Sequence, residues 1–230
     1  SRGLGDVYKR QLYDVADVVT YKPEKSWNYE VGAHLSTPSH KVQADLALFY
    51  IDCRDQQLTV FPEGQVTGRL MTNAGRTRSF GGEASLLATL WRNLDLQVAY
   101  GYTRATFVKF DTGKADYAGN FIPYAPQHTL YAGASYTLRT GWNWLEYVIF
   151  RVAANGAGRI YWNEANTFSQ PFYALLEASI RFEHRHWAVD VWGRNLTDTR
   201  YDTFYFMSIG NSFLQRGRPR TFGVSLSITL

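Results

Sequence analysis

Polar and apolar residues alternate strictly at the end of the chain. From Thr221 to Leu230 the sequence reads TFGVSLSITL. A period of two places the apolar residues on one face of a β-strand and the small or polar residues on the other. We expect the apolar face to meet lipid and the polar face to meet a wet barrel lumen. The apolar positions are Phe222, Val224, Leu226, Ile228 and Leu230.

Eight earlier segments show the same alternation, so the sequence predicts an all-β fold of about nine strands. No stretch of 11 or more residues has helical periodicity. The faces of one segment, Trp144–Ala157, are ambiguous. Another segment is expected to resume at Tyr201–Met207, and Leu58–Phe61 is a candidate extension. The eight segments are Ser26–Thr37, Lys41–Cys53, Gly75–Leu90, Leu94–Val108, His128–Leu138, Trp144–Ala157, Pro171–Glu183 and Trp187–Arg194.

The expected connections alternate between short and long. Short turns are predicted around Ser39, Arg92, Gly141 and Arg185. Outer-membrane barrels have short periplasmic turns and long outer loops, and their tilted strands need about 9–11 residues. The pattern therefore predicts an antiparallel, up-and-down transmembrane barrel. The long segments are Arg54–Asn73, Lys109–Gln127, Gly158–Gln170 and Ser208–Gly217.

The composition of the two predicted faces favours this barrel over a soluble β-protein with an aromatic core. Tyr and Trp favour membrane interfaces, and such residues lie near strand ends: Trp27, Tyr29, Tyr50, Tyr100, Tyr102, Phe172, Trp187 and Phe222. The opposite face would line a polar interior with Lys41, Asp45, Glu83, Asp95, Gln97, Glu177, Arg181, Asp190 and Arg194.

Overall composition narrows the classes further. Charged residues make up 19% of the chain, below the roughly 25% of soluble domains. The net charge of +4 comes without a Lys/Arg run, so a nucleic-acid partner is not expected. No window approaches the ~20 apolar residues of a transmembrane helix. The single cysteine, Cys53, is expected to be an idle thiol, with pairing to a cysteine elsewhere left open.

The predicted strand count indicates part of a larger protein. Nine strands leave two open edges in lipid, whereas bacterial barrels close with an even number of strands. There is no signal peptide. Residues 1–11, Ser1 to Gln11, fit nothing that follows and look like a translated adapter scar, so we expect the native barrel segment to span residues 12–230.

Five phrases resemble the C-terminal barrel of TonB-dependent outer-membrane receptors. In chain order they are Lys22–Gly32, Asn73–Glu83, Ile122–His128, Asn195–Tyr201 and Arg218–Gly223. The resemblance implies a 22-stranded barrel of which this chain forms the last nine strands. It also implies a plug and a TonB-contacting segment upstream. The final strand would be read by the barrel-assembly machinery, although the family usually ends on an aromatic residue and this chain ends on Leu230.

The resemblance implies active uptake of a scarce ligand across the outer membrane of a Gram-negative bacterium, with energy from TonB. A ferric siderophore is expected from family frequency alone. Aromatic and Arg side chains of the long loops and upper lumen could hold such an anionic, partly apolar chelate. The candidates are Arg76, Arg78, Tyr161, Trp162, Tyr205, Phe206 and Arg216.

Three alternatives stay open: a passive porin, an outer-membrane hydrolase and a soluble β-sandwich binding module. No nucleophile motif or phosphate loop is present, so no catalytic residue and no cofactor are expected. His184, His186 and Asp190 lie close together, but we interpret them as part of a turn rather than a metal site. Asn195 and Asp198 are expected to shape a bend or bulge rather than a glycosylation site.

Overall fold

The computed structural model describes residues 22–60, 70–112, 115–208 and 211–229. Over these residues the chain contains strands and no helix, which confirms the predicted all-β class. The strands are β1 (Lys25–Ser36), β2 (Val42–Val60), β3 (Leu70–Leu90), β4 (Leu94–Lys109), β5 (His128–Trp142), β6 (Leu145–Gly158), β7 (Ile160–Tyr161), β8 (Ser169–Gln170), β9 (Tyr173–His184), β10 (Trp187–Arg194), β11 (Asp202–Ser208), β12 (Asn211–Arg216) and β13 (Thr221–Ile228).

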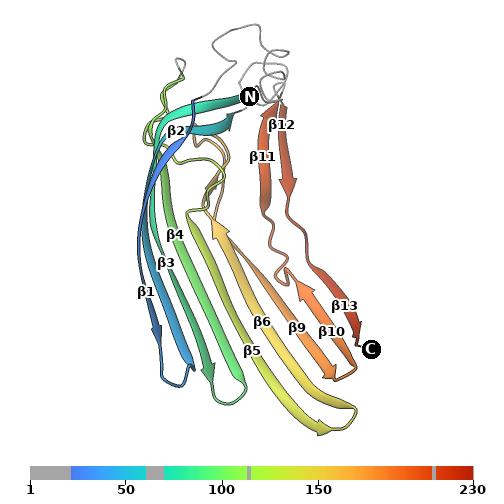
Figure 1. The fold of residues 1–230 in the computed structure, drawn as a ribbon. Coiled ribbons are helices and arrows are strands. Elements are labelled where there is room, and N and C mark those ends of the chain that lie inside the picture. Colours follow the sequence, from blue (N-terminus) through green and yellow to red (C-terminus); the bar gives the residue numbers. More distant parts are fainter. Residues whose placement is uncertain (1–21, 61–69, 113–114, 209–210, 230) are drawn as a thin grey trace.

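Nine of these strands form one antiparallel sheet in the order β1-β2-β3-β4-β5-β6-β9-β10-β13. The sheet curves into a trough, with short turns at the lower end and the longer connections at the upper end (Figure 1). Two small hairpins, β7–β8 and β11–β12, stand outside this sheet. The main sheet is therefore an open segment of barrel wall, with β1 and β13 at its free edges.

Two predicted loops proved to be largely strand. The segment Arg54–Asn73 was predicted as a connection, but β2 and β3 continue pairing from Gln56 opposite Ala74 to Val60 opposite Leu70. The segment Ser208–Gly217 contains β12, which pairs with β11. The candidate extension at Leu58–Phe61 is confirmed through Val60, so the first prediction was wrong only in part, whereas the second was wrong. One reason applies to both. Above the membrane a strand pair needs only its backbone ladder, so the sequence no longer has to alternate.

The resumption predicted at Tyr201–Met207 is strand β11, but it belongs to the separate hairpin and does not extend β10. The corner between them is built by Asn195, whose buried side chain donates hydrogen bonds to the carbonyl oxygens of Thr199 and Arg218 (3.0 and 3.1 Å). Asp198 accepts a bond from the backbone N–H of Arg220 (3.1 Å). Both residues have positive φ, of 49° and 52°. The predicted bend is confirmed.

The apolar face of the sheet is bare. Phe222 and Ile228 on β13 are 69% and 67% exposed, and Trp27 and Leu35 on β1 are 67% and 68% exposed. Within the described residues the sheet has no second layer to cover this face, as a soluble sandwich would need. The structure also assigns the faces of the segment Trp144–Ala157, which the sequence left ambiguous. On its strand β6, Arg151 pairs with Ser135 on the polar face.

The upper end of β4 and the connection that follows it share a small core. Phe107 and Phe110 are buried, with ring centroids 4.9 Å apart, and Tyr117 and Ile122 pack against them. No helix in the described part of the chain is long and apolar enough to cross a membrane. The predictions about residues 1–11 and about Leu230 lie outside the described residues.

Candidate functional site

Cross-strand register brings the predicted polar side chains onto one face. Residues directly opposite one another in an antiparallel pair point to the same side. His34, Asp45 and Ser85 form one such row across β1, β2 and β3. By the same register, eight of the nine residues predicted for the barrel interior point to one face of the sheet. They are Asp45, Glu83, Asp95, Gln97, Glu177, Arg181, Asp190 and Arg194. Lys41 precedes β2.

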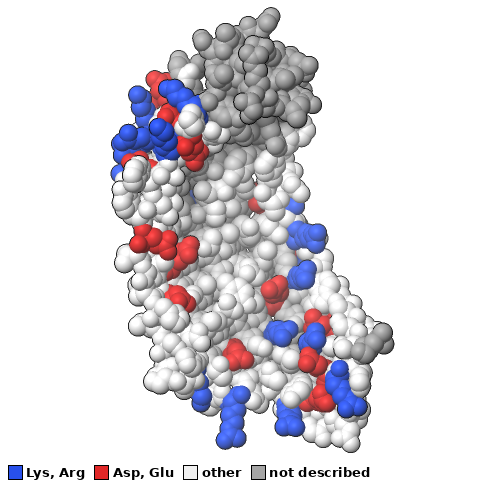
Figure 2. All heavy atoms as spheres, in the orientation of Figure 1, with Lys and Arg blue, Asp and Glu red and all other residues white. Residues whose placement is uncertain are grey.

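This polar face is hollowed and charged. One hollow of about 490 Å³ is lined by residues that include Asp95, Arg151, Glu177, Asp190 and Arg194. Figure 2 looks onto this side of the sheet and shows acidic and basic side chains along its length. The face can therefore hold water or a polar body inside the trough, as a barrel lumen does.

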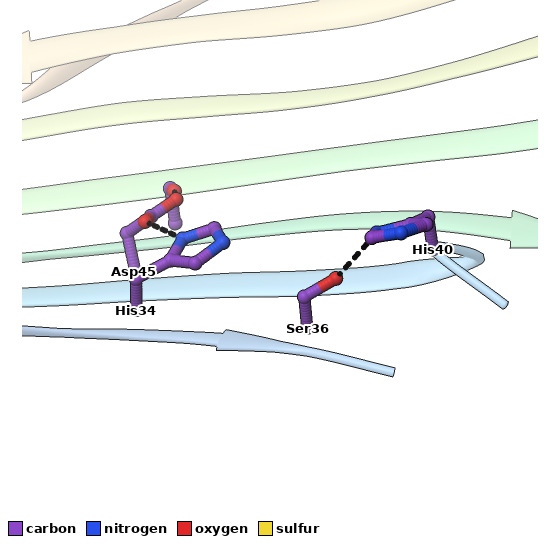
Figure 3. A network of polar contacts seen from close by, with 5 residues as sticks. His34, Ser36, His40 and Asp45 are labelled. Carbon is purple, nitrogen blue, oxygen red and sulfur yellow. Dashed lines mark hydrogen bonds and ion pairs between the residues drawn. The ribbon is translucent and has the colours of Figure 1, made fainter. Parts of the chain in front are cut away.

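Many polar groups on this face bond to one another. His34 Nδ1 lies 2.6 Å from Asp45 Oδ1, and Ser85 donates to Asp45 Oδ2 at 3.0 Å. Nearby, Ser36 Oγ and His40 Nδ1 are 3.1 Å apart (Figure 3). Ser85 contacts the carboxylate of Asp45 and not the imidazole of His34, whereas Ser36 contacts a different histidine, His40. The serine–histidine and histidine–carboxylate contacts of an activated nucleophile are therefore not made by one histidine here.

One carboxylate oxygen on this face lacks a hydrogen-bond partner among the described residues. Asp190 Oδ1 is buried and has no hydrogen-bond partner among the described residues. The lining hydrogen bonds nearby include that from Trp192 Nε1 to Ser225 Oγ, at 3.1 Å. A buried carboxylate oxygen is costly to leave unpaired, so the face around Asp190 is suited to a further polar contact.

The upper end of the trough carries an aromatic cluster. Tyr124, in the connection between β4 and β5, packs against Trp162 and stacks on Phe204 (5.5 Å between centroids in each case). Its hydroxyl donates to the carbonyl oxygen of Tyr205 at 2.8 Å. Phe168 stacks on the Tyr205 ring at 4.7 Å. Contacts through Tyr124 thus join three connections that are far apart in the sequence.

Four of the seven predicted ligand candidates lie in or beside this cluster. Trp162 and Tyr205 are buried and hold the connections together. Tyr161 stacks on Phe121 (5.3 Å), and Phe206 stacks on Phe213 (5.0 Å). Arg216 lies exposed at the end of β12, on the same hairpin as Tyr205 and Phe206.

Arg76 and Arg78 lie elsewhere, on strand β3 and not in a loop. Their register partners across β2 are Arg54 and Asp52, and the next row down pairs Phe80 with Tyr50 on the apolar face. Arg76 donates to both carboxylate oxygens of Asp52, at 2.8 and 2.6 Å. The two arginines therefore point away from the polar trough.

Sequence reasoning missed the residues that join the cluster: Phe121, Tyr124, Phe168, Phe204 and Phe213. The long connections are rich in aromatic residues, and this density was the signal available in the sequence. These residues do not recur at a regular period, so the sequence could not assign them to a face.

The single cysteine, Cys53, is buried on the polar face beside Thr77.

The structure offers no metal centre in the described residues, where no three His, Cys, Asp or Glu side chains gather. His184 and His186 pack with ring centroids 5.6 Å apart beside the turn that joins β9 to β10.

Comparison with known proteins identifies the architecture. A family model described as TonB dependent receptor-like, β-barrel matches residues 5–196. The chain belongs to this family. As a TonB-dependent receptor barrel, it is located in the outer membrane of a Gram-negative bacterium, as the resemblance of its five phrases implied.

Individual relatives agree with this assignment. The receptor barrel is 28% identical to the pesticin receptor of Yersinia pestis over 96% of this chain and 32% of the relative. It resembles the crystal structure of the ferric yersiniabactin uptake receptor of Yersinia pestis with a TM-score of 0.74 and 25% identity, over 89% of this chain and 30% of that one. The siderophore receptor PiuA of Acinetobacter baumannii gives a TM-score of 0.69 and 18% identity, over 92% and 29%. The chain thus spans about a third of the length of these relatives.

Proposed function

We propose that the protein is an outer-membrane receptor that takes up a ferric siderophore with energy from TonB. The observation that carries the proposal is the aromatic cluster at the mouth of a polar-lined trough, in a barrel of the TonB-dependent receptor family. The relatives named above include a ferric yersiniabactin uptake receptor and a siderophore receptor.

The cluster offers suitable chemistry for such a ligand. Phe213 and Leu214 on β12 are each 47% exposed, so the hairpin presents apolar surface above the trough. Phe206 borders this surface by stacking on Phe213, and Arg216 adds a cation that can pair with an anionic chelate. Tyr161 directly precedes the cluster residue Trp162 and stacks on Phe121. We propose these residues as ligand contacts, with Trp162 and Tyr205 as their support.

The proposal includes partners beyond the ligand. TonB would act through a segment outside this chain, and the barrel-assembly machinery would act through the final strand. The apolar face would contact outer-membrane lipid, and no nucleic-acid partner is proposed. We also propose that the protein is not an enzyme, because its work is binding and transport.

Uptake by an iron-starved strain tests the proposal. The full-length gene would be expressed in a strain that lacks its own siderophore receptors, with and without a functional TonB. Radioactive iron would be supplied as ferric yersiniabactin, ferric citrate or ferric pyoverdine. We expect TonB-dependent uptake of at least one of these chelates. Equal uptake without TonB would instead support a passive porin.

A single substitution tests the proposed contact. Replacing Arg216→Gln should raise the half-saturating chelate concentration about tenfold, because a hydrogen bond to a charged group is lost. The matched control is Arg139→Gln, an exposed arginine at the opposite, short-turn end of β5. Equal effects of the two substitutions would contradict the assignment of Arg216.

A further inference from the structure

We propose that the outward face of β1 to β4 binds the phosphate groups of an anionic lipid in the outer leaflet. The site is a basic patch of six residues at the upper end of these strands, on the lipid side of the wall. Its members are Lys25, Arg54, Arg76, Arg78, Arg104 and Lys109.

Cross-strand register defines the patch. The uppermost row runs Lys25, Arg54, Arg76 and Lys109 across four neighbouring strands. Arg78 lies one row below, between Asp52 and Thr106, and Arg104 lies one row further down beside Phe80. Because strands are about 4.8 Å apart, the patch is about 14 Å wide. That width suits a headgroup that carries more than one phosphate.

The level of the patch matches the headgroup region. On β2 the outward-facing residues from Val42 to Tyr50 are apolar or aromatic. Nine residues at about 3.3 Å each, tilted by about 45°, span about 21 Å, close to the ~25 Å apolar band of such barrels. Arg54 lies just above this band. The upper end carries the long connections, which in these barrels face the cell exterior (Figure 1).

The patch has a large excess of positive charge. Five of the six cations are exposed, and Arg76 is half-buried. Asp52 is the one carboxylate at the outward-facing positions of these rows of β1 to β4, and it forms an ion pair with Arg76. Arg104 also lies over the ring of Phe121, 5.4 Å from its centroid. The exposed cations are therefore available to an outside anion, and Arg is well suited to bidentate phosphate contacts.

Below the cations lies a surface suited to acyl chains. Trp27, Tyr29 and Tyr50 form the outward face beneath the patch, with Leu48 and Val31 one row lower. A phosphorylated lipid could place its headgroup on the cations and its chains on these rows.

Within the strands of the sheet, outward-facing Lys and Arg residues lie only on this part of the wall, and the exposed Arg220 lies just before β13 rather than in it. The outward-facing positions of β5, β6, β9 and β10 carry no Lys or Arg. A general interfacial preference for cations would have distributed them around all strands.

Lipid titration of the intact receptor tests the site. The full-length protein would be placed in phosphatidylcholine nanodiscs, and binding of bisphosphorylated lipid A would be followed by native mass spectrometry. In the double variant Arg54→Gln/Arg78→Gln we expect the half-saturating lipid concentration to rise at least about tenfold. The control variant Arg92→Gln/Arg139→Gln, which removes two exposed cations at the short-turn end, should bind as the wild type does.

Two further measurements distinguish binding of a lipid phosphate from binding of the lipid chains or of free phosphate. Lipid A without its phosphates should bind the wild type as weakly as bisphosphorylated lipid binds the double variant. Inorganic phosphate at the lipid concentration should not displace the lipid. Undiminished binding by a folded double variant, equal binding of the dephosphorylated lipid, or displacement by inorganic phosphate would each overturn the proposal. Heat-modified gel mobility reports folding of every variant, and siderophore uptake is not used as a readout.

Discussion

Asn195 shows how one side chain can set the course of the chain. Its buried amide donates two hydrogen bonds and its Oδ1 accepts a third, from the backbone N–H of Thr199 at 2.8 Å. One of these bonds reaches Arg218, 23 residues later, so the corner after β10 is tied to the start of β13. Asn also tolerates the φ of 49° found here.

Replacing Asn195→Ala should destabilise the folded barrel by about 2–3 kcal/mol, because three hydrogen bonds are lost and buried backbone groups are left unpaired. Urea titration of the refolded receptor, read by gel mobility, measures this change. The control is Asn143→Ala in the exposed turn between β5 and β6, which should shift the midpoint little. If both variants unfold at the same urea concentration, the corner does not hold the fold as argued.

At the scale of elements, the strands of the main sheet and the hairpin at its upper end are held in place by different contacts. Strands of the wall pair with their chain neighbours, so local alternation is sufficient to place them. The hairpin β11–β12 instead leaves the sheet and is fixed by contacts from other connections. Tyr124 supplies two of these, by stacking on Phe204 and by its hydrogen bond to Tyr205.

Replacing Tyr124→Phe should loosen this hairpin without unfolding the wall. The loss of one hydrogen bond to a half-buried carbonyl is worth about 1–1.5 kcal/mol, so local opening and cleavage in β11–β12 should rise about tenfold. Limited proteolysis with mass mapping detects this change. Tyr136→Phe, on the lipid face, is the control. Cleavage that rises equally in both variants would show that the hydroxyl of Tyr124 does not restrain the hairpin.

At the scale of the whole molecule, the two faces of the sheet have opposite requirements. The convex face exposes aliphatic and aromatic residues, whereas the trough contains carboxylates and arginines. This arrangement is the opposite of that in a soluble protein, which buries its apolar residues and exposes its charged ones. It is stable in a membrane, where the apolar face is solvated by lipid and the polar face encloses an aqueous lumen.

Two adjacent residues of β2 test this arrangement. Leu46 points to lipid near the middle of the apolar band, and Ala47 points to the trough opposite Glu83. Leu46→Arg should destabilise the barrel in bilayers by about 2–4 kcal/mol, whereas Ala47→Arg should cost much less. Reversible unfolding in lipid vesicles gives both values. A larger cost for Ala47→Arg would reverse the assigned faces.

The amino-acid sequence alone predicts the class of the protein, because alternation is a local property of each strand. It fixed the nine strands of the wall, the residues on the two faces of most of them, the bend at Asn195 and the family. It missed strand β12 and the upper part of β3, and it marked the upper part of β2 only as a candidate extension at Leu58–Phe61. In these parts lipid no longer imposes a period. The three-dimensional structure was needed to show which loop aromatics meet at Tyr124, and to show that Arg76 and Arg78 lie on the outward face of the wall and not in the lumen. Those outcomes depend on register across strands and on contacts between distant connections, which no local pattern encodes.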